Sequence, residues 1–134
     1  MSIIWHFISS LILGISLYGE SYNLVIAFII GGTLIDIDHL LISSYKTKSL
    51  NMRKNIEWLK ENFKTHTPHY YIFHSGIAII FFLVLALSPW PIVRAIALGA
   101  LLHLLVDVAT YLYVYRSIKP WGKFFCLITG LLKK

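Results

Sequence analysis

The sequence predicts an all-α membrane protein with four transmembrane helices, a cytoplasmic amphipathic helix and a short C-terminal interfacial segment. Of its 134 residues, 57% are hydrophobic and only 13% are charged, which departs from a soluble globular domain. The apolar residues fall into four runs, each close to the length that crosses the hydrocarbon of a bilayer. Such runs form helices, because open strand edges are not tolerated in lipid. The chain length predicts a single polytopic membrane domain over 1–134.

Each apolar run defines one predicted span. The first covers about 3–18 and the second about 22–43, and the short turn YGES joins them. The third covers about 71–88 and the fourth about 92–114, joined by the turn SPWP. The first run lacks the basic start of a signal peptide, so we expect it to be a retained helix.

Basic residues predict the orientation of these spans. Six of the twelve Lys and Arg lie between the second and third spans, five follow the fourth, and only Arg94 lies on the other side. The positive-inside rule therefore places both termini and the long connection in the cytoplasm, as in a multi-pass protein of the inner membrane. The net charge of +6 follows the membrane boundary, which predicts anionic lipid headgroups as partners and no nucleic acid.

Two segments outside the spans are amphipathic or apolar. The connection at 51–64 places Met52, Ile56, Leu59 and Phe63 on one helical face. This pattern predicts an amphipathic helix in the cytoplasmic headgroup region, with a lid over a site as the alternative. Near the C-terminal end, WGKFFCLITGLLKK is too short to cross a bilayer, and we expect it at the interface or against the bundle.

Acidic residues and histidines interrupt the apolar runs, most clearly in GGTLIDIDHL at 31–40. Two Asp in hydrocarbon cost about 5–7 kcal/mol, which nearly cancels the insertion energy of their own segment, so they need a function. On the predicted topology all four spans bring such residues to the cytoplasmic leaflet, and none to the other. The residues are His6, Asp36, Asp38, His39, His69, His74, His103 and Asp107.

Helical spacing in part supports a shared site for these side chains. His103 and Asp107 are four residues apart, and Asp36 and His39 are three apart, so each pair shares a helix face. Asp38 is about 200° from Asp36 around a regular helix and joins that face only if the helix is distorted. Just before this segment, two glycines at 31–32 permit close approach of another helix.

The ligand types in this cluster indicate a metal. Imidazole and carboxylate ligands without thiolates suit zinc, manganese or iron, and this number of ligands fits one or two ions. Two ions about 3.5–4 Å apart generate a hydroxide and bind a phosphoryl or acyl oxygen, which is hydrolytic chemistry.

Three blocks of the sequence carry a family resemblance, namely DIDH at 36–39, HYYIFHS at 69–75 and GALLHLLVD at 99–107. They are similar, in order, to the motifs L-P-D-x-D-H, H-R-G-x-T-H-S and G-x-x-S-H-x-x-x-D of the YdjM-type family of inner-membrane-associated, metal-dependent hydrolases. His6, Thr110 and the stretch KPWGKFF also fit the expected places. The resemblance implies a hydrolytic site similar to that of zinc phospholipases. It implies metal ligands at Asp36, Asp38, His39, His69, His74, His103 and Asp107.

The sequence departs from the family pattern at five positions. Ile35 stands in place of the proline before the first Asp, so no proline breaks the helix there. Tyr70 and Tyr71 stand in place of Arg-Gly, Phe73 in place of Thr and Leu102 in place of Ser. If the family Arg binds a substrate phosphate, this chain has lost that contact or moved it elsewhere.

Together these observations predict a membrane-embedded hydrolase that acts at the cytoplasmic leaflet on a lipid or lipid-linked ester or phosphoester. The cofactor is expected to be a divalent metal, zinc first and manganese or iron as alternatives. Asp38, away from the shared face, is the candidate catalytic base or a ligand that bridges two ions. Two other functions stay open: a metal-ion or proton transporter, or a non-catalytic membrane interaction protein with a polar structural core. The sequence carries no signal for a particular oligomeric state.

Overall fold

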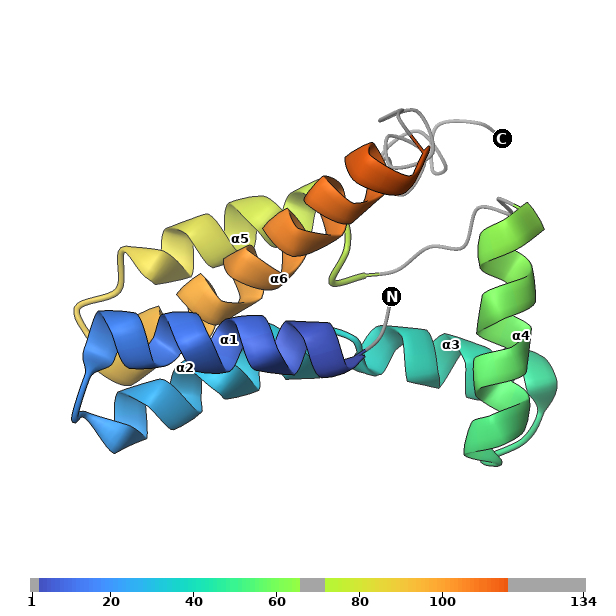
Figure 1. Cartoon of the computed structure of the whole chain (residues 1–134), viewed down its shortest axis with the longest axis horizontal. Helices are drawn as coiled ribbons and strands as arrows, with labels where there is room; N and C mark the ends of the chain where they lie inside the picture. The colour runs from blue at the N-terminus through green and yellow to red at the C-terminus, as the bar shows by residue number, and fades with distance from the viewer. Residues whose placement is uncertain (1–2, 66–71, 116–134) are drawn as a thin grey trace.

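The structure, a computed structural model, describes residues 3–65 and 72–115 (Figure 1). Within these ranges the chain is helical and contains no strand, so the predicted all-helical fold is confirmed. His69 and the predicted C-terminal interfacial segment lie outside the described residues. The helices are α1 (Ile3–Tyr18), α2 (Tyr22–Leu34), α3 (Ile37–Thr47), α4 (Met52–Thr65), α5 (Gly76–Ala86) and α6 (Pro91–Tyr115).

Four of the helices form a bundle. Helices α2 and α6 make its most extensive contact, α1 packs on α2, and α5 packs on α6 (Figure 1). Helix α3 continues from α2 beyond the bundle, and α4 crosses the far end of α3 (Figure 1). The bundle core consists mainly of small and aromatic side chains, including Phe28, Phe82, Ala95 and Ala97.

The central α2–α6 contact depends on glycine. A Cβ atom on Gly31 would overlap a backbone carbonyl of α6, and one on Gly99 would overlap a backbone carbonyl of α2. A Cβ atom on Gly32 would overlap the Ser10 hydroxyl of α1. The expectation that the glycines at 31–32 permit close helix approach is therefore confirmed, and Gly99 has the same role on α6.

Two helical runs are long and apolar enough to cross a membrane, namely Tyr22–Thr47 and Pro91–Thr110. The other two predicted spans contain shorter apolar helices, Ile4–Tyr18 and Gly76–Ala86. Two of the four predicted spans therefore reach spanning length in the described part of the chain. All four bundle helices expose large apolar side chains on their outer surfaces, which suits a lipid environment.

The second predicted span is interrupted where its acidic residues begin. Helix α2 ends at Leu34, α3 begins at Ile37, and the two residues between them form a turn. Asp36 keeps a helical φ of −71° while its ψ moves to −4°, so the interruption needs no proline. The helix is therefore distorted between Asp36 and Asp38, which is the condition that the sequence set for Asp38 to join the face of Asp36.

The predicted amphipathic helix corresponds to α4, and a buried polar network attaches it to α3. Asn55 is fully buried and donates to Ser44 Oγ at 2.8 Å and to the Ser49 carbonyl at 3.0 Å. Its Oδ1 accepts a hydrogen bond from the Thr47 hydroxyl. This network holds α4 across the end of α3.

Candidate metal centre

Seven of the eight predicted site residues lie close together where four parts of the fold meet. These parts are α1, the α2–α3 turn together with the start of α3, the segment just before α5, and the middle of α6. Most of the side chains are buried, and two of them are half-buried. The residues are His6, Asp36, Asp38, His39, His74, His103 and Asp107.

Four potential ligand atoms converge at the centre of this cluster. His74 Nε2 lies 3.3 Å from His103 Nε2 and 3.3 Å from Asp107 Oδ2. His103 Nε2 lies 3.5 Å from the same Asp107 oxygen. Asp36 Oδ1 lies 3.3 Å from His103 Nε2 and 3.7 Å from His74 Nε2. The atoms therefore form two triangles that share the edge between the two imidazole nitrogens.

Hydrogen bonds determine which imidazole nitrogen faces the centre. His103 Nδ1 lies 2.8 Å from the Gly32 carbonyl oxygen, which can only accept, so Nδ1 carries the proton. His74 Nδ1 lies 3.2 Å from Asp38 Oδ2, which also accepts the Phe73 backbone N–H at 3.0 Å. In the neutral rings each Nε2 therefore presents a lone pair to the centre.

This arrangement fits a small divalent cation. Two imidazole nitrogens and two carboxylate oxygens face one another, and all four offer lone pairs, so a positive charge between them is favourable. In tetrahedral zinc sites with bonds of about 2.0–2.1 Å, neighbouring ligand atoms are about 3.3–3.4 Å apart. The five separations found here, from 3.3 to 3.7 Å, are close to that spacing.

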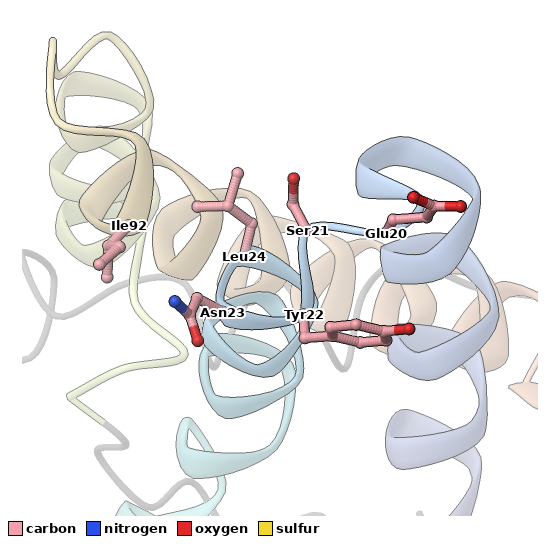
Figure 2. Close-up of a pocket in the computed structure, with 6 residues that line it drawn as sticks. All are labelled: Glu20, Ser21, Tyr22, Asn23, Leu24 and Ile92. Carbon is pink, nitrogen blue, oxygen red and sulfur yellow. The ribbon is translucent and has the colours of Figure 1, made fainter.

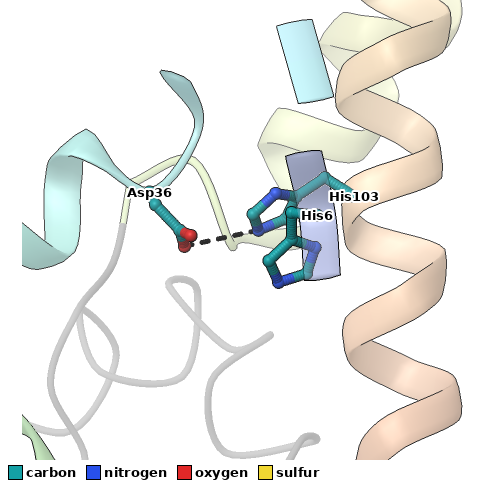
Figure 3. A group of neighbouring side chains, drawn as sticks. All are labelled: His6, Asp36 and His103. Atoms are coloured by element: carbon teal, nitrogen blue, oxygen red, sulfur yellow. Dashed lines mark ion pairs between the residues drawn. The ribbon is translucent and has the colours of Figure 1, made fainter. Parts of the chain in front are cut away.

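Two further histidines extend the cluster. His6 Nε2 lies 3.3 Å from Asp107 Oδ1, and the His6 ring stacks on His103 at a centroid distance of 3.7 Å. Figure 3 shows this stack beside Asp36. His39 Nε2 lies 3.6 Å from Asp36 Oδ1. Ligand atoms within 4.8 Å of one another also occur in His6–Asp36–His103 and in Asp36–His39–His74, two further triads that could hold an ion and that share residues with the central atoms.

Asp38 lies on the outer side of His74 rather than among the converging atoms. Its Oδ2 contacts the His74 ring and the Phe73 backbone N–H. Its Oδ1 is buried and has no hydrogen-bond partner among the described residues. Asp38 therefore contacts the centre through His74, a position that the sequence did not distinguish from that of a ligand or a base.

Sequence reasoning also missed one main-chain contribution to the site. The Gly32 carbonyl orients His103, because the close α2–α6 approach brings this histidine within hydrogen-bond distance. The glycine pair before the acidic segment was a signal for close packing, but it gave no sign of this hydrogen bond. Near His74, the Ser75 side chain accepts from the Ala78 backbone N–H and caps α5, which fixes the start of that helix.

A separate open pocket lies at the α1–α2 turn, at the opposite end of α1 (Figure 2). Glu20 is its only charged lining residue, and no histidine lines it. At 1.5 Å per residue, Glu20 lies about 20 Å along α1 from His6, so the pocket takes no part in the cluster. Its lining residues are Glu20, Ser21, Tyr22, Asn23, Leu24 and Ile92.

The cluster therefore supplies mixed nitrogen and oxygen ligands in a largely buried place, with hydrogen bonds that orient at least two of the imidazoles. Such a set of ligands could hold a divalent metal ion. Searches against protein-family models, curated proteins and solved structures found no match to this chain.

Proposed function

We propose that this protein is a membrane-embedded, metal-dependent hydrolase and that its His/Asp cluster binds one or two divalent cations, zinc foremost. The proposal rests on the convergence of His74 Nε2, His103 Nε2, Asp36 Oδ1 and Asp107 Oδ2. A divalent cation held by these four atoms would supply the activation of water and the polarisation of an ester or phosphoryl oxygen. The chain itself binds the ion, orients the imidazoles and excludes bulk water through burial of the site.

The distribution of polar residues favours hydrolysis over transport. A transport pathway needs polar groups through the whole membrane, whereas the potential ligands gather in one place. Toward the α1–α2 turn, the described interior contains the apolar residues Phe28, Ala95 and Ala97, with Ser10 as its buried polar side chain. The potential ligands therefore resemble a single localised site more than part of a transport pathway.

We further propose that four helices span the membrane and that the cluster lies at the cytoplasmic leaflet, with both termini in the cytoplasm. The positive-inside rule supports this orientation, because six Lys and Arg lie in the connection that contains α4. Helix α4 crosses the end of the Tyr22–Thr47 run, as expected for a basic helix among anionic headgroups (Figure 1). A site in that leaflet favours a lipid or lipid-linked ester or phosphoester as substrate.

Membership of the YdjM-type family is part of the same proposal. The described parts of the three resembling blocks contribute side chains to one cluster, although they are far apart in the sequence. Asp36 and His39 come from the first block, His74 from the second, and His103 and Asp107 from the third. Such convergence is expected if the blocks are parts of one metal site.

Metal content of detergent-purified protein tests this function. The comparison includes the wild type, His103→Ala and Asp107→Asn, with Glu20→Gln as the control because Glu20 lies in the distant pocket. We expect one or two equivalents of zinc, manganese or iron in the wild type and the control. Both cluster variants should lose metal while keeping the helical circular dichroism signal. Absence of metal from the wild type, even after reconstitution with each ion, would overturn the proposal.

A second measurement separates hydrolysis from transport. Metal-loaded wild type and His103→Ala are compared on phospholipids and on lipid-linked esters in mixed micelles, and then for metal and proton flux in liposomes. We expect hydrolysis that depends on His103 and no flux above empty liposomes. Flux that depends on His103, without hydrolysis of any ester, would replace the hydrolase by a transporter.

A further inference from the structure

We infer that Asp38 is a positioning residue, which holds His74 so that Nε2 faces the metal centre, and that it is not a ligand of this centre. The inference rests on the proposed metal site and assigns one of its acidic residues a distinct role. The three aspartates of the chain lie within one cluster, but their contacts differ. Asp36 and Asp107 direct oxygens at both His74 Nε2 and His103 Nε2, whereas Asp38 contacts the opposite nitrogen of His74.

A single oxygen of Asp38 fixes two parts of the segment before α5. Oδ2 lies 3.2 Å from His74 Nδ1 and 3.0 Å from the backbone nitrogen of Phe73. The first contact selects the ring tautomer and rotation, and the second holds the backbone from which the ring projects. Asp38 is 4% exposed and His74 is 5% exposed, so water does not compete effectively for these hydrogen bonds.

The second central histidine is held in an equivalent way by a different group. His103 Nδ1 faces the Gly32 carbonyl oxygen at 2.8 Å, and its Nε2 faces the centre. Metal-bound histidines generally donate their other N–H to a carboxylate or a backbone carbonyl, which fixes their orientation. Asp38 provides the carboxylate form of this contact, and Gly32 provides the carbonyl form.

The break between α2 and α3 makes this role possible. In an uninterrupted helix Asp38 would lie about 200° from Asp36 and would face away from the cluster. Because the chain turns between Leu34 and Ile37, Asp38 enters the first turn of α3 and reaches His74 from the outer side. The two aspartates of DIDH thus act on different nitrogens of the same imidazole.

A tautomer measurement tests the inference without metal. In metal-free protein labelled with ¹⁵N-histidine in micelles, at an alkaline pH where the imidazoles are neutral, the His74 resonances are identified by their absence from His74→Ala. We expect the Nδ1–H tautomer in the wild type and its loss in Asp38→Ala. The tautomer of His103 should not change, because Gly32 holds that ring. An Nε2–H tautomer in the wild type, or an unchanged His74 signal in Asp38→Ala, would overturn the positioning role.

Metal competition titrations distinguish positioning from ligation. We expect Asp38→Ala to weaken zinc binding by about 10–100-fold without changing the number of ions bound. In a His74→Ala background, the same substitution should change affinity less than about threefold, because Asp38 acts through His74. A tenfold or larger further loss in that background, or an ion lost from the stoichiometry, would make Asp38 a ligand instead.

The two readouts also separate this inference from the proposed function. If the wild type binds no metal but its His74 tautomer depends on Asp38, the hydrolase proposal fails and the positioning role stands. If the wild type binds metal but the tautomer does not depend on Asp38, the metal site stands and the positioning role fails.

Discussion

Two buried polar networks lie at the two ends of α3, and they differ in how hydrogen-bond donors are matched to acceptors. At one end of the helix, the Asn55 amide donates to Ser44 and to the Ser49 carbonyl, and it accepts from Thr47. At the other end, His74 Nε2 and its three neighbours in the cluster all present acceptors to one another. Both networks are buried, but only the first is complete in itself.

The difference separates a structural network from a binding site. A buried amide whose two N–H groups and carbonyl oxygen are all hydrogen-bonded needs no further partner, and it holds two helices together. Converging lone pairs need a cation or extra protons, and two imidazole nitrogens 3.3 Å apart cannot both carry a proton without repulsion. Neighbouring groups are also oriented toward the cluster, such as the Gly32 carbonyl that holds His103. We therefore expect the cluster to respond to metal and the Asn55 network to be indifferent to it.

The largest expected effect is metal-dependent stabilisation through the cluster. At free zinc about 1,000 times the dissociation constant, binding to the folded state adds about 4.1 kcal/mol to the free energy of unfolding. His103→Ala should lose this increment, because it removes a nitrogen shared by both ligand triangles. Thermal or SDS unfolding with and without zinc measures the effect. Equal zinc stabilisation of wild type and variant would contradict the assignment of the centre.

The next effect concerns the glycine contact that brings α2 to α6. Gly31→Ala should cost up to about 3 kcal/mol of stability, because the new Cβ overlaps a backbone carbonyl of α6. Gly14→Ala is the matched control, since its Cβ would lie 3.4 Å or more from its neighbours and alanine favours the helix by about 1 kcal/mol. Denaturant titration compares the two variants. If Gly31→Ala is as stable as Gly14→Ala, the helices are not in close contact in solution.

A smaller effect is expected at the complete network. Asn55→Ala should destabilise the attachment of α4 by about 1–2 kcal/mol, because it leaves Ser44, Thr47 and the Ser49 carbonyl without their amide partner. Hydrogen exchange along α4 should increase, while zinc affinity should stay within about twofold of the wild type. A large loss of zinc affinity would show that the two networks are coupled, and would contradict their separation.

The sequence was sufficient for the helical elements and for most members of the cluster. The 3–18 run matches the helix Ile3–Tyr18, and the amphipathic pattern at 51–64 matches Met52–Thr65. Insertion cost indicated that Asp36, Asp38 and Asp107 need a function, because a carboxylate in an apolar run is unfavourable by itself. Both inferences depend on local composition and periodicity, which can be read from a single sequence.

The remaining features depend on long-range geometry. The predicted third span at 71–88 contains the shorter helix Gly76–Ala86, which begins where the Ser75 side chain caps it. The distinct position of Asp38 depends on a helix interruption that no proline signals and on a contact with a residue 36 positions away. Spacing along one helix could place Asp38 near the cluster, but not on a particular nitrogen of His74.

The smallest effect is expected on the outer surface of α4, where Arg53 and Glu57 form an ion pair at 3.2 Å. Both side chains are largely exposed, so solvent screening limits the pair to about 0.3–0.5 kcal/mol. Glu57→Gln should therefore lower the free energy of unfolding by no more than about 0.3–0.5 kcal/mol. In 0.5 M salt the variant and the wild type should be equally stable. Because the substitution makes α4 more basic, it should also bring α4 closer to the headgroups when the protein is reconstituted in vesicles that contain anionic lipid, but not in neutral vesicles. Quenching of tryptophan fluorescence by brominated lipids, relative to the wild type, measures this approach. Equal quenching in the two kinds of vesicle would contradict a headgroup position for α4 and leave its basic face to another partner.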